Sequence, residues 1–313
     1  MTDEADFAAS SLPAASGPSA RKMRPQPATR VLEGRLAAPL LSSRGRNWSG
    51  LTLELHSFVD LDTVVQGFDH VIAVHLAGAV QLHQTRGGRT RSRTMNTGDI
   101  TITPVGPPTR WRQSGQSLVI LLRLAPGYLQ TVAGDECAID PERFEIQAHF
   151  ATRDPYIEHI GKQLLAGLEL EGRDSRLYVD THVCELAIHL LREYTTGSAT
   201  MVWPKTQLSP HKLRRTIDFI DENLHGELTL NTLAQAVALS PGHFAHAFRA
   251  ATGVTPHRYV VERRVETAKA LLRQSDLPIT EIAQRIGCSS HSHFSVQFHR
   301  VTGLTPRQYR NRE

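Results

Sequence analysis

The chain has 313 residues, a length that favours two domains over one compact core. Its 21% charged and 40% apolar residues are ordinary for a globular protein, and it holds neither a signal-peptide pattern nor an apolar run long enough for a membrane helix. The formal net charge of +4 is concentrated at the C-terminal end, where residues 209–313 hold 14 Lys/Arg and 9 Asp/Glu. Such a basic block favours a nucleic-acid partner, because phosphates attract Lys and Arg.

The first 28 residues differ from the rest of the chain in composition. They are rich in Ala, Ser and Pro and hold few large apolar groups. A segment of this kind cannot bury enough surface to offset its loss of conformational entropy. We therefore expect a disordered tail at 1–28 and a folded domain at 29–195.

Strand patterns extend from Val31 to Leu124. Leu51, Leu53 and Leu55 alternate with polar residues, and short apolar runs follow further along the chain. The pair at 87–88, Gly-Gly, predicts a two-residue hairpin turn, since both positions of a type I′ turn need positive φ. Several short strands indicate an antiparallel sandwich or barrel.

Two helical patterns follow, at 154–171 and 174–194. In each of them large apolar residues recur every three or four positions, which gives the helix one apolar face. Two such faces can cover the barrel or form the seam of a homodimer, and the sequence favours neither use. The periodicity is lost after the second helix and returns at Ser209, so we expect a linker at 196–208.

The most informative feature of the chain is an internal duplication. Segments 244–259 and 294–309 match at Phe, Phe, Thr, Gly, Thr, Pro and Tyr with a constant offset of 50 residues. Upstream, 233–240 matches 282–289 with an offset of 49, so the second copy has one extra residue in its turn. Each copy has the pattern of a short helix, a turn and a second helix. The duplication therefore predicts two helix-turn-helix units.

Local signals in the two copies support these helices. Phe244 and Phe248 lie one turn apart and are expected in the core. Residues that favour helix ends stand at the expected boundaries: Thr229, Ser240, Pro241, Gly253 and Gly303.

One long helix is expected between the copies. Its apolar stripe consists of Val261, Val265, Ala268 and Leu272. Four basic residues are expected outside this stripe: Arg258, Arg263, Arg264 and Lys269. A stiff helix of this length would hold the two helix-turn-helix units apart.

The second copy carries an ordered set of motifs. I-A-x-x-x-G, S-x-S-x-F, F-x-R-x-x-G-x-T-P and Y-R occur as Ile282, Ala283, Gly287, Ser290, Ser292, Phe294, Phe298, Arg300, Gly303, Thr305, Pro306, Tyr309 and Arg310. The long helix adds R-x-x-x-A-x-x-L-L, as Arg264, Ala268, Leu271 and Leu272. With these motifs, residues 209–313 resemble the DNA-binding domain of the AraC/XylS family of bacterial transcription regulators.

The resemblance implies a fold for the whole chain. Residues 29–195 would form a cupin-like antiparallel β barrel with two helices, a sensor and dimerisation domain. Residues 209–313 would form an all-α domain of two helix-turn-helix units joined by a long helix. The predicted fold class is therefore α+β.

A recognition helix presents its N-terminal residues to base edges in the major groove. The predicted DNA-binding residues are Gly242, His243, His246, Arg249, Ser290, His291, Ser292, His293, Val296, Gln297 and Arg300. His243 and His291 are the strongest candidates for base contacts, because an imidazole can donate to guanine or accept from an exocyclic amine. Arg249, Gln297 and Arg300 lie a turn further on and suit phosphate contacts, although Arg249 can equally form a surface ion pair.

The chain departs from the resembled family at positions that bear on recognition. Members often carry an arginine two residues after the first core aromatic of each recognition helix, where this chain has His246 and Val296. The glycine of the first turn is Ala238, and the aromatic that usually follows the second-turn glycine is Cys288. Because valine offers only apolar contact, for instance to a thymine methyl, the target sequence is expected to differ while DNA binding is retained.

Metal and redox sites are not expected. His291 and His293 form an H-x-H pair, but residues two apart on a helix point to different faces. Cys288 is expected to be a small buried residue. Together with Cys137 and Cys184 it shows no spacing typical of disulfide frameworks or zinc knuckles, which fits a reducing cytoplasm.

The N-terminal region carries part of a cupin motif. Gly98, Pro104 and Gly106 match G-x5-P-x-G, but Thr109 replaces the histidine that a metal cupin needs. We therefore expect a metal-free sensory barrel.

Two features of that barrel have alternative uses. Arg89, Arg91 and Arg93 share one strand face, which can receive an anionic ligand or simply face solvent. Trp111 can line a pocket, although we expect it to fill the barrel end.

These observations predict a cytoplasmic, sequence-specific transcription regulator without catalytic residues, cofactor or metal ion. Its expected partners are double-stranded DNA, RNA polymerase, a small-molecule effector and a second copy of the chain, with no membrane contact. The resemblance implies activation more than repression. The alternatives are a cupin-type enzyme fused to a DNA-binding domain and an effector-independent architectural DNA binder.

Overall fold

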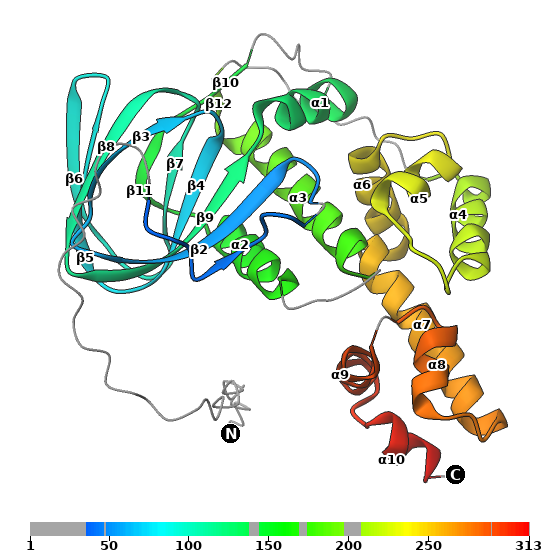
Figure 1. Ribbon diagram of the computed structural model, residues 1–313. Coiled ribbons are helices and arrows are strands. Elements are labelled where there is room, and N and C mark those ends of the chain that lie inside the picture. Colours follow the sequence, from blue (N-terminus) through cyan, green and yellow to red (C-terminus); the bar gives the residue numbers. More distant parts are fainter. Residues whose placement is uncertain are drawn as a thin grey trace, which may run out of the picture. The chain divides into compact units, whose positions relative to one another are not determined.

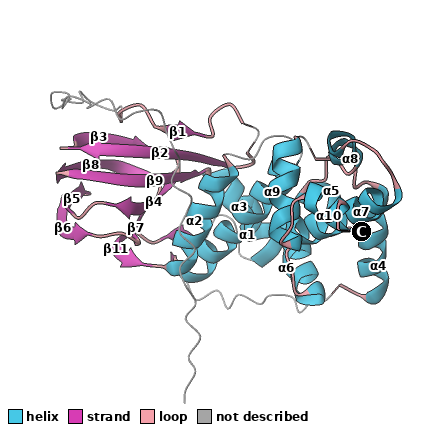
Figure 2. Cartoon of the chain, turned by 90° about the horizontal axis from the view of Figure 1, so that it is seen from below, coloured by secondary structure: helices cyan, strands magenta, loops and turns pink. Residues whose placement is uncertain are grey.

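The computed structural model describes residues 36–46, 48–137, 144–168, 174–196, 208–288 and 290–312. The expected tail at 1–28 and the greater part of the expected linker lie outside these residues. Strands fill most of the region up to residue 124, and every described element from Pro210 onward is a helix (Figure 1). The chain is thus a mixed α/β protein with a sheet-rich N-terminal region and a helical C-terminal region (Figure 2).

The N-terminal region contains two antiparallel sheets and a short separate ribbon. The larger sheet has the order β1-β2-β9-β4-β7-β11 and the smaller one β3-β8-β5-β6, while β10 pairs with β12. The strands are β1 (Leu41–Ser42), β2 (Leu51–Val59), β3 (Asp62–Gly67), β4 (His70–Ala77), β5 (Val80–Arg86), β6 (Arg89–Met95), β7 (Asp99–Thr103), β8 (Gly106–Ser114), β9 (Gln116–Leu124), β10 (Glu145–Ile146), β11 (His149–Arg153) and β12 (Thr195–Thr196).

The predicted barrel is wrong in its closure. Strand β8 pairs with β3 and β5, whereas the next strand, β9, pairs with β2 and β4, so the chain changes sheets at Gly115. Strand β6 forms one edge of the smaller sheet, and its Arg89, Arg91 and Arg93 are exposed. Charged side chains on an edge strand oppose further pairing. The two sheets consequently stay separate in the described strands, as in the sandwich alternative.

Helices cover one face of the larger sheet. The alternating leucines of β2 are buried there with Ile72, Val74, Ile100 and Ile102. Against them pack α1 (Pro126–Cys137), α2 (Pro155–Gly167) and α3 (Asp174–Glu193), with α2 beside β2, β4 and β9 (Figure 1). Of the two uses left open for the helices at 154–171 and 174–194, the structure therefore shows the first. The hairpin at 87–88 is also confirmed, with φ of 54° and 75°.

The C-terminal region holds the two predicted helix-turn-helix units. Its helices are α4 (Pro210–Glu222), α5 (Leu230–Ala236), α6 (Pro241–Thr252), α7 (Pro256–Gln274), α8 (Ile279–Arg285), α9 (His291–Thr302) and α10 (Pro306–Arg310). Phe244 and Phe248 are buried in the core of the first unit, and Phe294 and Phe298 in that of the second. Within the described residues, no helix is both long and apolar enough to cross a membrane.

Candidate nucleic-acid interface

The first unit consists of α5, a turn and α6. Thr229 and Thr232 cap the start of α5 reciprocally, with each backbone N–H donating to the other hydroxyl at 3.1 Å. Ser240 precedes Pro241 at the start of α6, as predicted, but its side chain makes no capping hydrogen bond. In the turn, Ala238 takes a φ of 51°, a left-handed conformation that strains any residue with a Cβ.

The second unit consists of α8, a turn and α9. Its turn places Gly287 at a φ of 83°, where an added Cβ would lie 2.3 Å from the carbonyl oxygen of Leu224. Glycine is therefore required here by both conformation and space. Ser290 caps α9 by accepting from the His293 N–H at 3.2 Å, and Gly303 ends the helix at a φ of 74°.

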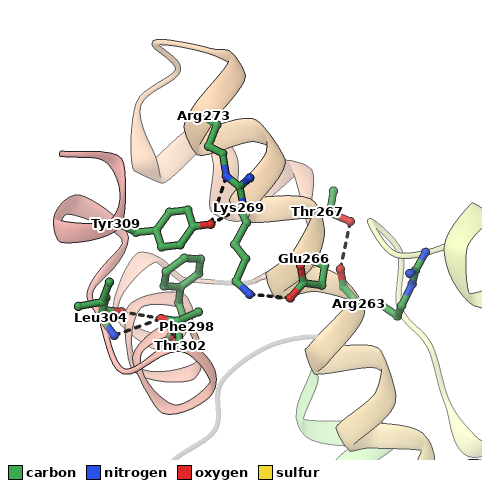
Figure 3. A network of polar contacts seen from close by, with 9 residues as sticks. All are labelled: Arg263, Glu266, Thr267, Lys269, Arg273, Phe298, Thr302, Leu304 and Tyr309. Carbon is green, nitrogen blue, oxygen red and sulfur yellow. Dashed lines mark hydrogen bonds and ion pairs between the residues drawn. The ribbon is translucent and has the colours of Figure 1, made fainter. Parts of the chain in front are cut away.

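Matching aromatic triplets hold each recognition helix. Phe248 lies between Phe244 and Tyr259, with ring centroids 5.4 and 5.3 Å away. Phe298 lies between Phe294 and Tyr309, at 5.5 Å from each. In the second unit the Arg273 guanidinium also donates to the Tyr309 hydroxyl and lies over its ring (Figure 3). These contacts fix the orientation of α6 and α9, because three of the four ring pairs are edge to face and such pairs orient rings as well as bury them.

The connecting helix α7 departs from prediction at Arg264. Its apolar stripe is buried as expected, but Arg264 is 2% exposed rather than on the outer side. The Arg264 guanidinium donates to the carbonyl oxygens of Leu224 and Gly226, at 2.9 and 3.1 Å, and so ties α7 to the loop after α4. The prediction was wrong because a buried cation is tolerated where carbonyl acceptors meet it.

Helix α9 presents most of its predicted DNA-binding residues. His291, Ser292, Val296 and Arg300 are exposed, and Val296 is 67% exposed although it is apolar. An exposed valine at this place fits an apolar contact with a partner better than a structural role.

The remaining predicted residues of α9 make contacts within the helix or at its N-terminal cap. Gln297 is half-buried, and its side-chain amide contacts the His293 Nε2 at 3.1 Å. Burial and the nearby Arg264 lower the pKa of His293. Ser290, His293 and Gln297 are therefore less accessible to a partner than the four exposed residues of α9.

Helix α6 is more enclosed. His246 and Arg249 are exposed, His243 is half-buried, and Gly242 is buried. Burial, with His246 and Lys212 nearby, lowers the pKa of His243 and so favours the neutral imidazole, in which one nitrogen donates a hydrogen bond and the other accepts one.

The enclosure comes from helices of the N-terminal region. Both α1 and α3 pack against α6. Leu177 and Cys184 of α3 are buried in the same apolar cluster as Ala245 of α6. At its edge Arg249 pairs with Glu185 of α3, with Nη1 and Oε1 3.4 Å apart. The ion pair that was one of two alternatives for Arg249 is thus present.

A histidine at the neighbouring contact of α3 with α7 was not predicted. His257 is half-buried, and its ring lies 4.9 Å from that of Tyr178, edge to face. Burial, with His182, His293 and Arg300 nearby, lowers the pKa of His257 to about 3. No local sequence signal marks this position, because α3 comes from a distant part of the chain.

A second candidate site is a cavity of about 90 Å³ between the two sheets. Trp111 and Thr109 line it, so the expectation that Trp111 fills a barrel end was wrong. The arginines of β6 do not line it. Among the described residues, no group of three or more His, Cys, Asp and Glu is arranged to hold a metal ion. The wall of the cavity is mostly apolar and also includes the charged side chains of Asp69, Arg86 and Arg123.

Comparisons with known proteins concentrate on the C-terminal region. A helix-turn-helix domain model matches residues 233–312. The Arabinose operon regulatory protein of Salmonella typhimurium is 26% identical over 162 residues, covering 50% of this chain and 54% of the relative. The HTH-type transcriptional activator RhaS of Shigella boydii is 32% identical over 102 residues, covering 33% and 37%. The C-terminal region of this chain is an AraC-type helix-turn-helix domain.

Solved structures are similar to about a third of this chain. The C-terminal domain of the response regulator AraT from Geobacillus stearothermophilus is 31% identical, with a TM-score of 0.33, and the match covers 34% of this chain and 89% of that one. The DNA-binding domain of AdpA, solved with a target DNA, is 32% identical with a TM-score of 0.32, covering 32% and 91%. The match to the curated relatives named above spans only about a third to a half of their length.

Proposed function

We propose that this protein is a sequence-specific transcription regulator whose helices α6 and α9 enter successive major-groove segments on one face of DNA. The observation that carries the proposal is the pair of aromatic-braced recognition helices, of which α9 exposes His291, Ser292 and Val296 at its N-terminal end. An N-terminal end of this kind is the part of a recognition helix that meets base edges. The two helices would lie one helical turn of DNA apart, about 34 Å.

The AraC-type region at 209–313 would supply DNA binding, and 29–195 would form a cupin-like sensor. The cavity between the sheets supports binding of a small effector there. We further propose that the protein acts in the cytoplasm, where bacterial DNA lies, and activates transcription through contact with RNA polymerase, as one copy or as a homodimer. The relatives named above are transcriptional regulators, and one is named an activator. No observation favours an enzyme or an architectural DNA binder.

Gel-shift titration of the full chain against promoter DNA from its own genome tests the proposal. His291→Ala is expected to change the order of preference among DNA sequences, since a base contact carries sequence information. Thr94→Val serves as a control that leaves DNA binding unchanged, because Thr94 is exposed on β6 and distant in sequence from the recognition helices. Equal binding of all sequences by the wild-type protein would contradict sequence-specific regulation.

A further inference from the structure

We propose that the cavity between the two sheets binds an uncharged organic molecule of about one ring that carries a hydroxyl group, held by His75 and Thr101. The inference rests on the proposed function, in which the N-terminal region senses an effector, and it names the chemical class of that effector.

Two buried polar atoms of the cavity wall have no hydrogen-bond partner among the described residues. They are the Nδ1 of His75 and the Oγ1 of Thr101, in side chains of residues only 2% and 1% exposed. A buried polar atom without a partner is costly, so such atoms are rare in native structures and call for an explanation. A ligand that supplies the missing hydrogen bonds provides one.

The positions of these two residues suit one hydroxyl group. Thr101 of β7 lies opposite Ala73 of β4, and His75 stands two residues further along β4 on the same face. Diagonal neighbours of this kind lie about 7–8 Å apart in antiparallel sheets, so the two side chains border the same part of the cavity. A ligand hydroxyl can donate to one partner and accept from the other, which a carbonyl oxygen cannot do.

The rest of the cavity wall is mostly apolar. It includes Phe58, Leu82, Trp111, Val119 and Leu121. A wall of aromatic and aliphatic groups with few polar atoms is typical of sites for small apolar molecules and does not suit a sugar or polyol. The volume of about 90 Å³ is smaller than that of a cavity of about 150 Å³ that accommodates benzene, so the occupant can hold no more than one ring.

The charges at the cavity favour a neutral ligand. Arg86, Arg123 and Asp69 line it, and Arg123 donates to Glu54 at 3.0 Å. Glu54 lies outside the cavity wall and also pairs with Arg44 at 2.9 Å, so Arg123 is held in an ion-pair network beside the cavity. The terminal nitrogens of Arg86 donate to oxygen atoms at positions 104, 105, 107 and 109 rather than facing an open acceptor site. Burial, opposed in part by Asp99, lowers the pKa of His75 to about 4, so His75 adds no charge at neutral pH.

Calorimetric titration of the full chain with four probes tests the ligand class. The probes are 4-methylphenol, toluene, benzoate and glucose. We expect 4-methylphenol to bind, toluene to bind about 3- to 10-fold more weakly because it lacks the hydroxyl, and neither benzoate nor glucose to bind measurably. Equal binding of toluene, tighter binding of benzoate or glucose, or binding of none of the four at millimolar concentration would overturn the proposal.

Substitutions locate the bound hydroxyl. Thr101→Val keeps the shape of the side chain and is expected to weaken 4-methylphenol binding about 3- to 10-fold without affecting toluene, whereas the exposed Thr94→Val changes neither. An unchanged affinity for 4-methylphenol in Thr101→Val overturns the assignment. Gel shifts of the same protein preparations distinguish the proposed ligand class from the proposed DNA-binding function. If the wild-type protein binds DNA but not the ligand, only the ligand class is contradicted. If the wild-type protein does not bind DNA, the proposed function is contradicted.

Discussion

The two helix-turn-helix units share one internal design and differ in their surroundings. In each, a phenylalanine pair and a tyrosine brace the recognition helix. Helix α9 leaves His291, Ser292 and Val296 exposed, whereas α6 has Gly242 and Ala245 buried against other helices. The comparison teaches that a repeated core specifies a repeated shape without specifying which repeat is open to a partner.

The enclosure of α6 has a chemical basis in its small residues. Gly242 and Ala245 bring little side-chain volume, so α3 can approach closely and bury Leu177 and Cys184. Glu185 closes the edge by pairing with Arg249, although burial raises the pKa of this carboxyl group and Arg249 lowers it again in part. In this arrangement the N-terminal end of α9 is open, whereas α3 covers part of α6.

The largest effect on stability is expected from the turns of the two units, where one unit has Gly287 and the other has Ala238. Gly287→Ala should lower the free energy of unfolding by about 2–4 kcal/mol, because the new Cβ would strain the backbone and collide with the Leu224 carbonyl oxygen. The matched change in the first unit, Ala238→Gly, should raise it by about 0.5–1 kcal/mol by relieving a left-handed alanine. Chemical denaturation measures both. Changes of the same sign in the two variants would show that the two turns do not differ as described.

The next effect concerns DNA affinity. Val296→Glu should weaken binding about 10- to 100-fold, because it places a carboxylate on the exposed face of α9 near the phosphates. His246→Glu on α6 is expected to weaken binding less, since this helix is partly enclosed by α3. Gel-shift titration compares the two variants. A greater loss for His246→Glu would mean that α6, not α9, dominates DNA binding.

One arginine on each recognition helix tests the same difference between α9 and α6 in DNA binding. Arg300→Ala should weaken binding to all DNA sequences alike and lower the slope of log affinity against log salt by about 1, as expected for one lost phosphate contact. Arg249→Ala should change the slope less, because Arg249 is already paired with Glu185. Titrations at several salt concentrations measure both slopes, and Arg93→Ala on β6 is the control. A larger change for Arg249→Ala would contradict the difference between the units.

The smallest effect is expected from the ion pair itself. Glu185→Ala should raise DNA affinity about 2- to 5-fold by weakening the contact of α3 with α6, in line with the modest energies of partly exposed pairs. Glu193→Ala, which removes an exposed acid of the same helix paired with Arg192, should have no such effect. Fluorescence anisotropy with labelled DNA can resolve this difference. Weaker binding by Glu185→Ala would show that the pair supports DNA binding instead of restraining it.

The sequence predicted the parts of the fold that depend on local signals. The left-handed glycines at 253 and 303, the buried phenylalanines and the hairpin at 87–88 all rest on neighbours within a few residues. Barrel closure was mispredicted because it depends on pairing between strands distant in sequence. Helix α1 was missed because it has no acidic residue in its first turn and no basic residue in its last.

The candidate site, like the fold, was predictable only where it depends on local sequence signals. The motif placed the recognition helices, and the structure brings His291, Ser292 and Val296 to the exposed face of α9. The enclosure of α6 depends on contacts with α1 and α3, and the burial of Arg264 on carbonyl groups about 40 residues away. The unpartnered atoms of the cavity wall likewise depend on how two sheets face each other, which alternation along one strand does not show.

Hydroxyl-radical footprinting of the full chain on its own promoter DNA tests the two-helix account most directly. Two protected segments centred about 10.5 base pairs apart on one face of the duplex are predicted, with the segment bound by α6 becoming stronger in Glu185→Ala. A single protected segment at low salt that Glu185→Ala does not extend would contradict the account.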